Sequence, residues 1–332
     1  MRNSLTLTLI AAAAVAVIGA PSAVGAQLRV RATADAGPWR TWWSAPAAPT
    51  QWTSAHAVVR DAVRWRSTSP GVELGELSLS GPGEAWRVRV VLVRLDPART
   101  QLVLDADVDA SGTVRPWTID ATPAARAAAV ALNAGQFTDA GPWGWLVHGG
   151  REIQAPGRGT LSGTVVVFAD GRIGVLPADS LPALRSAVAS GAVREAIQSY
   201  PMLLTDGVVP TALRTAADVT PSGVDRDHRD ARLAIGTLTD GRILVALTRF
   251  DGLGGALGAV PFGLTVPEMA AVMGALGSRS ALMLDGGISA QLAVSETSGA
   301  RQAWTGLRRV PLGLVATTRA IQISPFRAKS AM

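Results

Sequence analysis

The chain contains no cysteine, one lysine (Lys329) and three histidines among its 332 residues. The lack of cysteine excludes disulfide bonds, a lipidated cysteine and zinc held by thiolates, so stability must come from a packed core. The histidines, His56, His148 and His228, lie in distant segments and do not form a metal-binding motif. We therefore expect no metal and no other cofactor.

Arginine supplies almost all of the positive charge, and the arginines are scattered rather than clustered. A formal charge of +6 would by itself suggest a nucleic acid or another anionic surface as partner. Because no basic cluster is present, we expect no nucleic-acid partner. Hydrophobic residues make up 48% of the chain and charged residues 17%, a composition that predicts a globular protein.

The N-terminal segment resembles an export signal. Arg2 precedes an apolar stretch that runs to Ala20, and small residues that include Val24 and Ala26 follow. This layout is typical of a secretory signal peptide cleaved after about Ala26. An uncleaved anchor is the alternative, because the stretch is near the lower length limit for spanning a bilayer. We expect residues 1–26 to be a signal peptide and the mature protein to be secreted or periplasmic, without stable membrane insertion after cleavage.

Residues 27–71 are rich in tryptophan, proline and alanine and show no clear period. We expect an arm or linker, with its tryptophans packed against the domain; stacking on sugar rings is the alternative use of these side chains. We expect residues 72–316 to form one domain and residues 317–332 to form a C-terminal tail.

Local patterns predict several helices and strands. The stretch "EAWRVRVVLVRLD" alternates apolar and polar residues, as a half-buried strand does. "TPAARAAAVALNAG" predicts a helix capped by Thr122 that ends near Asn133 to Gly135. "SLPALRSAVASGAVREAIQS" predicts a helix or a helix pair. "GLTVPEMAAVMGALG" predicts a helix in which Thr265 and Glu268 have the spacing of a capping box, so Glu268 has a structural use.

Asp-Gly pairs between apolar runs predict hairpins. Three of them are centred on Asp170-Gly171, Asp206-Gly207 and Asp240-Gly241. The order of strands, hairpins and interspersed helices predicts an α+β fold: a single domain with a mixed, largely antiparallel sheet flanked by helices.

The last Asp-Gly pair follows an apolar run in "SALMLDGGISAQLAV", at Asp285. The simplest interpretation is another hairpin, in which "ALML" turns into "QLAV". However, the linker "DGGISA" is longer than a two-residue turn needs, and it presents consecutive backbone N–H groups beside a carboxylate. Such a nest suits an anionic or polyhydroxyl ligand.

Several stretches of the chain, taken in order, resemble the phosphodiester glycosidase domain family. They are "LNAGQF", "QSYPMLLTDG", "RLAIG", "GLTVPEMAAVMGALGSRSALMLDGGISAQL" and "RRVPLGLVA". Two positions depart from the family pattern. Ile288 stands where the family often has a third glycine, and Leu233 stands where a threonine is usual.

The resemblance implies cleavage of a sugar-1-phosphodiester between the anomeric carbon and the phosphate oxygen. Such chemistry needs a carboxylate near the cationic anomeric centre and cations near the departing phosphate. Asp285 fits the first role, and Arg232 and His228 fit the second. Asn133, Gly286, Gly287 and Ser289 are the expected contacts with sugar hydroxyls or phosphate.

Each of these residues also has a purely structural alternative. Arg232 can pair with Asp230 or Asp227 at the surface, His228 can be a simple loop residue, and Asn133 can cap the preceding helix.

Two rival functions stay open at this point. One is a non-catalytic envelope protein that binds glycans, for which Ile288 and Leu233 would mark lost catalysis. The other is a metal-dependent phosphodiesterase, although the chain offers no dense His/Asp motif for it. The expected partner in the main hypothesis is a sugar phosphate or a polysaccharide.

Overall fold

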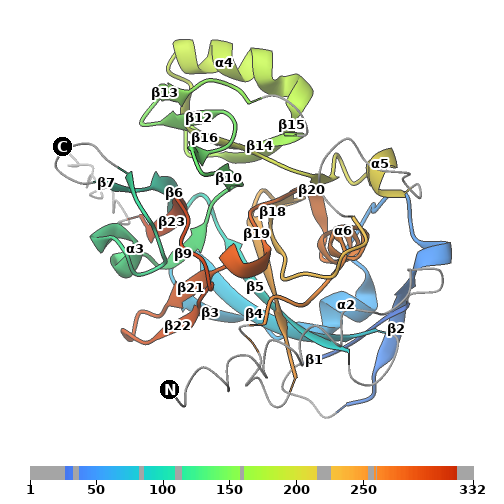
Figure 1. The fold of residues 1–332 in the computed structure, drawn as a ribbon. Helices are drawn as coiled ribbons and strands as arrows, with labels where there is room; N and C mark the ends of the chain where they lie inside the picture. Colours follow the sequence, from blue (N-terminus) through green and yellow to red (C-terminus); the bar gives the residue numbers. More distant parts are fainter. Residues whose placement is uncertain are drawn as a thin grey trace, which may run out of the picture.

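The computed structural model describes residues 27–32, 37–81, 86–108, 114–157, 161–214, 226–252, 258 and 260–319. Three β-sheets of five or more strands organise this part of the chain (Figure 1). Every pair of named strands in it is antiparallel, which confirms that the pairing is largely antiparallel but not that the sheet is mixed. The described residues are largely β, in several sheets with short helices, whereas we expected an α+β fold with one mixed sheet.

The largest sheet has nine strands, in the order β17 (Met202–Leu204), β20 (Ser278–Met283), β18 (Leu233–Leu238), β19 (Ile243–Phe250), β5 (Arg87–Leu95), β4 (Val72–Ser80), β1 (Gln27–Ala32) and β2 (Arg40–Ser44), with β3 (Arg66–Ser69) paired to β4.

The second sheet has the order β22 (Arg301–Trp304), β21 (Leu292–Ser295), β9 (Val130–Asn133), β23 (Gly313–Thr318) and β6 (Thr100–Asp105). The third has the order β13 (Arg151–Gln154), β12 (Leu146–His148), β16 (Val193–Ser199), β14 (Gly163–Phe168) and β15 (Ile173–Pro177). Two small ribbons pair β7 (Asp107–Val108) with β8 (Val114–Arg115) and β10 (Phe137–Thr138) with β11 (Gly141–Pro142).

The nine-stranded sheet is buried on both faces. On one face, Val88, Val90 and Leu92 of β5 share a core with α2 (Ala57–Ala62) and α6 (Val266–Ala275). On the other face, Val91 and Val93 share a core with the second and third sheets. The predicted alternation of buried and more exposed residues is present at the two ends of β5. The residues at its centre are all buried, because both faces of the sheet are covered there.

Residues 27–32, 40–44 and 66–69 are strands of this sheet, whereas we expected an arm or linker over residues 27–71. They contribute β1, β2 and β3, and β1 pairs with both β2 and β4. The side chains of Trp42, Trp43 and Trp52 are buried in the core on the α6 face. The sequence of β1, QLRVRA, alternates polar and apolar residues, and its apolar residues are the buried ones.

Two predicted helices are much shorter than expected. The hydroxyl of Thr122 caps α3 (Pro123–Ala127) as predicted, accepting from the N–H of Ala125 at 2.9 Å. The helix ends at Ala127 because the residues that follow form β9, which pairs with β21 and β23. Likewise α4 (Leu181–Ala189) is followed by β16, which pairs with β12 and β14. Pairing with distant strands overrides the helical preference of these alanine-rich stretches.

The predicted helix at 265–277 is confirmed as α6, with the full capping box between Thr265 and Glu268. Asp170-Gly171 and Asp240-Gly241 link β14 to β15 and β18 to β19, so these hairpins are confirmed. At Asp206-Gly207 the residues Thr205 and Val208 exchange two backbone hydrogen bonds of 2.9 Å. A short helix, α5 (Thr211–Arg214), follows this turn in place of a second hairpin strand.

Within the part of the chain that the structure describes, no helix has the length and apolar character needed to cross a membrane. The predicted signal peptide, residues 1–26, lies outside the described residues.

Candidate active site

Asp285 lies in a connection between two sheets. β20 pairs with β17 and β18 in the nine-stranded sheet, whereas β21 pairs with β9 and β22 in the second sheet. The residues between β20 and β21 include a short 3-10 helix, η4 (Gly287–Ser289). The hairpin interpretation of Asp285-Gly286 is therefore wrong. We call residues 284–291 the Asp285 loop.

Backbone hydrogen bonds hold the Asp285 loop against two other strand ends. The N–H of Asp285 donates to the carbonyl oxygen of Ala134, which follows β9, at 3.1 Å. The N–H of Gly287 donates to the carbonyl oxygen of Ala231, which precedes β18, at 2.7 Å. Asp285 thus lies where the nine-stranded sheet and the second sheet meet.

Both glycines after Asp285 are required by this close approach. A Cβ atom on Gly286 would lie 2.7 Å from the carbonyl oxygen of Ala231. Gly287 has a φ of +58°, and a Cβ atom there would lie 2.8 Å from a carboxylate oxygen of Asp230. The glycines therefore let the loop backbone pack directly against residues 230–232.

Asn133 joins the two ends of the Asp285 loop. Its side-chain N–H donates to the carbonyl oxygen of Asp285 at 2.8 Å, and its side-chain oxygen accepts from the N–H of Gln291 at 2.8 Å. Asn133 is the last residue of β9 and is fully buried, so it does not cap a helix. These two hydrogen bonds show that Asn133 positions Asp285. A direct contact between Asn133 and a substrate stays a prediction.

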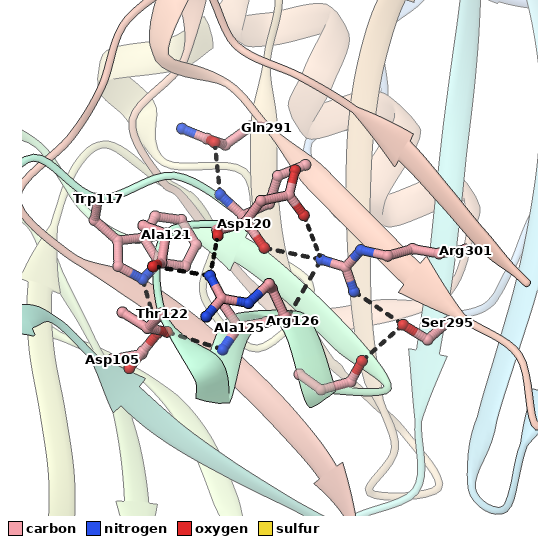
Figure 2. Close-up of polar contacts among 12 residues, drawn as sticks. Asp105, Trp117, Asp120, Ala121, Thr122, Ala125, Arg126, Gln291, Ser295 and Arg301 are labelled. Atoms are coloured by element: carbon pink, nitrogen blue, oxygen red, sulfur yellow. Dashed lines mark hydrogen bonds and ion pairs between the residues drawn. The ribbon is translucent and has the colours of Figure 1, made fainter. Parts of the chain in front are cut away.

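The far end of the Asp285 loop is anchored to the segment that precedes α3 (Figure 2). The side-chain oxygen of Gln291 accepts from the N–H of Ile119 at 3.0 Å. Asp105 of β6 fixes that segment by accepting from the indole N–H of Trp117 at 2.7 Å and from the hydroxyl of Thr122 at 2.5 Å. The loop is therefore supported from two strands and from the start of α3.

The carboxyl group of Asp285 has an unusual electrostatic environment. The pKa of Asp285 is raised from 3.8 to about 6, mainly by burial and to a smaller extent by the negative charge of Asp230. A hydrogen bond from the Ser289 side chain, the positive charge of Arg308 and the N–H of Gly286 act in the opposite direction. Asp285 therefore changes its protonation state close to neutral pH.

Asp230 is a second carboxylate beside the Asp285 loop. Burial raises its pKa, whereas the positive charges of Arg232 and His228 and the N–H of Ala231 lower it. The Ala231 hydrogen bond to its carboxylate is 2.8 Å long. Asp230 thus interacts electrostatically with Arg232 and His228 on its own segment and with Asp285 on the neighbouring loop.

The side chain of Arg232 anchors its own segment. It is buried, and its guanidinium donates to the carbonyl oxygens of Leu264 and His228 at 2.9 and 2.6 Å. The neighbouring Arg229 forms two hydrogen bonds of 2.6 and 2.7 Å with Glu268 at the start of α6. His228 itself is exposed to solvent. Residues 228–232 are therefore held between α6 and β18, with His228 at the outer edge.

Tyr200 also lies near Asp285, on the connection from the third sheet to the first. Burial raises the pKa of the Tyr200 hydroxyl, and the negative charge of Asp285 adds to this effect. The ring meets Trp143 edge to face, with centroids 5.2 Å apart. Gln136 positions the Tyr200 backbone by donating to its carbonyl oxygen at 2.7 Å. Three sheets therefore contribute residues to this neighbourhood.

Sequence reasoning missed Asp230, Tyr200 and Arg308 as members of the site. Each carries a signal that is visible in hindsight. Asp230 lies two residues before Arg232, Tyr200 is the one tyrosine of the chain, and Arg308 begins the stretch "RRVPLGLVA". None of these signals says that the residue lies near Asp285, because that neighbourhood arises from pairing between distant strands.

Among the described residues, no group of three or more His, Cys, Asp or Glu side chains is arranged to hold a metal ion.

The two departures from the family pattern lie in different places. Leu233 is fully buried in β18, whereas Ile288 is 45% exposed at the edge of the Asp285 loop. Of these two residues, only Ile288 is therefore accessible from solvent.

Comparison with known proteins gives a consistent assignment. Residues 126–317 match the family model of phosphodiester glycosidase. The fold resembles the catalytic domain of zebrafish N-acetylglucosamine-1-phosphodiester alpha-N-acetylglucosaminidase, auto-inhibited by its pro-peptide, with a TM-score of 0.57 and 16% identity over 82% of this chain and 96% of that one. It also resembles a Burkholderia pseudomallei protein whose description proposes that it is exported, with a TM-score of 0.51 and 15% identity over 77% of this chain and 96% of that one. No curated protein sequence matches the chain.

Proposed function

Because the chain belongs to the phosphodiester glycosidase family, we propose that it hydrolyses a sugar-1-phosphodiester between the anomeric carbon and the phosphate oxygen. The observation that carries this proposal is the Asp285 carboxyl group, which is partly buried on a glycine loop where two sheets meet. A carboxylate in such a place stabilises or attacks a positively charged anomeric carbon. Asp230 is the second carboxylate that glycoside hydrolysis ordinarily uses.

The leaving group in this reaction is the phosphate with its remaining ester group, and it departs as a phosphomonoester. It is weakly basic, so it needs little help from a proton donor and more help from neutralising cations. Water supplies a hydroxyl group to the anomeric carbon, and the other proton of that water goes to the phosphomonoester or to solvent. Asp285 must be ionised to act on the anomeric carbon. We therefore expect kcat/KM to fall as the pH is lowered through about 6, the pKa of Asp285.

The position of bond cleavage provides the decisive experiment. The enzyme would hydrolyse a sugar-1-phosphodiester in water enriched in ¹⁸O, with the products followed by ³¹P NMR and mass spectrometry. A glycosidase places the label on the sugar, because water attacks carbon. Label on the phosphate would instead support a phosphodiesterase and would contradict the proposal.

The same assay separates the remaining alternatives. Turnover in the presence of a chelator is expected to equal turnover without it, since the proposed chemistry uses side chains alone. Tight binding of the glycan without turnover would support the non-catalytic envelope protein, for which the exposed Ile288 at the loop edge is the relevant departure. The partner in the main proposal is a sugar phosphate or a polysaccharide that carries this linkage.

We also infer that the protein acts outside the cytoplasm. Support comes from the apolar segment before Ala26 and from the small residues at the expected cleavage site. Terminal sequencing of protein recovered from the culture medium or periplasm should start near Gln27. Recovery of the uncut chain in the membrane fraction would favour the anchor instead.

A further inference from the structure

The loop between β22 and β23 packs on the Asp285 loop. The N–H groups of Leu307 and Arg308 both donate to the carbonyl oxygen of Ile288, at 2.7 and 2.9 Å. A Cβ atom on Gly306 would lie 3.0 Å from the carbonyl oxygens of Ile288 and Ser289. The two loops are therefore in direct backbone contact, and the position of one sets the position of the other. We call residues 304–309 the Arg308 loop.

Arg249 of β19 forms hydrogen bonds with both of these loops. Its guanidinium donates to the carbonyl oxygens of Ala290, Trp304 and Thr305, at 2.6, 3.2 and 3.2 Å. Burial lowers the pKa of Arg249 to about 10. One buried guanidinium thus bonds the end of the Asp285 loop and the start of the Arg308 loop, which fixes their separation.

The side chain of Arg308 is held beside Asp285 by a ring. Its guanidinium carbon lies over the ring of Phe137, 4.5 Å from the ring centroid, which is the geometry of a cation–π contact. Its positive charge reaches the carboxyl group of Asp285. Arg308 is exposed to solvent. An exposed guanidinium that is held over an aromatic ring can still offer paired N–H groups to a planar or tetrahedral anion.

Arg232 is in a different situation. Its guanidinium is buried and donates to two carbonyl oxygens of the protein. We expected Arg232 to meet the departing phosphate, but the more accessible guanidinium beside Asp285 belongs to Arg308. Arginine binds phosphate through paired N–H groups, and a phosphate held there would lie within reach of the carboxylate that acts on the anomeric carbon.

We propose that Arg308 binds the phosphate of the substrate and makes the site selective for phosphodiester over neutral leaving groups. The inference rests on the proposed function, because it assigns the phosphate position within the same site. When the bond between the anomeric carbon and the phosphate oxygen breaks, the negative charge stays on the phosphate, and Arg308 neutralises it.

The test compares two substrates that share one sugar: its 1-phosphodiester and its neutral aryl glycoside. Arg308→Gln should lower kcat/KM for the phosphodiester by about a hundredfold and for the aryl glycoside by less than about threefold. Arg308→Lys should recover part of the loss, because it keeps the charge without the paired N–H groups. Arg309→Gln, a change at the adjacent exposed arginine, is the matched control and should behave as the parent does.

Inorganic phosphate provides a second readout that does not depend on turnover. The parent should bind it in a calorimetric titration, and Arg308→Gln should weaken that binding at least about tenfold. Equal losses on both substrates, or an equal effect of Arg309→Gln, would overturn the assignment. If the parent hydrolyses neither substrate, the proposed function fails, while the phosphate titration still decides whether Arg308 binds the anion.

Discussion

Replacing Asp285 by asparagine tests both the electrostatics and the chemistry of the site. The amide keeps the size of the side chain and part of its hydrogen bonding but removes its charge. If the carboxylate acts on the anomeric carbon, kcat/KM for a sugar-1-phosphodiester should fall by about a hundredfold or more, because a preorganised charge is lost. At the same time the variant should be more stable than the parent at alkaline pH, because the fold disfavours the charged form of Asp285.

The magnitude of the stability change follows from the pKa. The difference between the ordinary value of 3.8 and about 6 in the fold corresponds to about 3 kcal/mol between the protonated and charged forms. Partial solvent access reduces this, so we expect about 1–2 kcal/mol. The contribution is fully present below pH 4 and is lost as the pH rises through about 6. The variant should therefore gain about 1–2 kcal/mol over the parent at pH 8 and nothing at pH 4.

Urea unfolding at both pH values measures this difference, and Asp240→Asn is a control of opposite sign. Asp240 belongs to a simple Asp-Gly hairpin, and a hydrogen bond from Arg242 lowers its pKa. Its contribution is present above pH 4 and is lost as the pH falls through its lowered pKa, so Asp240→Asn should be less stable than the parent at pH 8. An Asp285→Asn variant that keeps most of its rate and gains no stability at pH 8 would refute the reasoning.

The other predictions concern the support of the Asp285 loop and its second carboxylate. Asn133→Ala leaves the carbonyl of Asp285 and the N–H of Gln291 without their partner, and we expect a loss of about 2–3 kcal/mol in urea unfolding; an unchanged midpoint would contradict the role of Asn133 in bracing the loop. Gly286→Ala places a Cβ atom 2.7 Å from the Ala231 carbonyl oxygen and should lower both stability and activity. In the control Gly174→Ala, the new Cβ atom would lie 3.4 Å from the Phe168 ring, so this variant should melt within a few degrees of the parent. Asp230→Asn removes the second carboxylate and should lower kcat/KM. It also removes a negative charge that raises the pKa of Asp285, so the acid side of the remaining pH profile should move to lower pH; a profile that stays in place or moves upward would contradict this effect of Asp230 on Asp285.

Local signals in the sequence predicted the elements whose partners are close along the chain. The hairpins at Asp170-Gly171 and Asp240-Gly241 pair strands on either side of a two-residue turn, and the capping box of α6 lies within four residues. The same kind of signal failed after Ala127 and after Ala189, where alanine-rich sequence continues as a strand. Those strands are central in their sheets, and their partners lie far away in the sequence.

The family, the absence of disulfide bonds and the place of Asp285 before two glycines can all be read from the order of residues along the chain. The pairing of distant strands was needed to show that Asp285 links two sheets, that Asp230 and Tyr200 interact with it electrostatically, and that the Arg308 loop packs against the Asp285 loop. The reason is physical. A turn or a cap is specified by residues within one or two turns of chain, whereas this site forms where the ends of β9, β16, β18 and β20 meet, and that meeting depends on strand pairing across the whole domain.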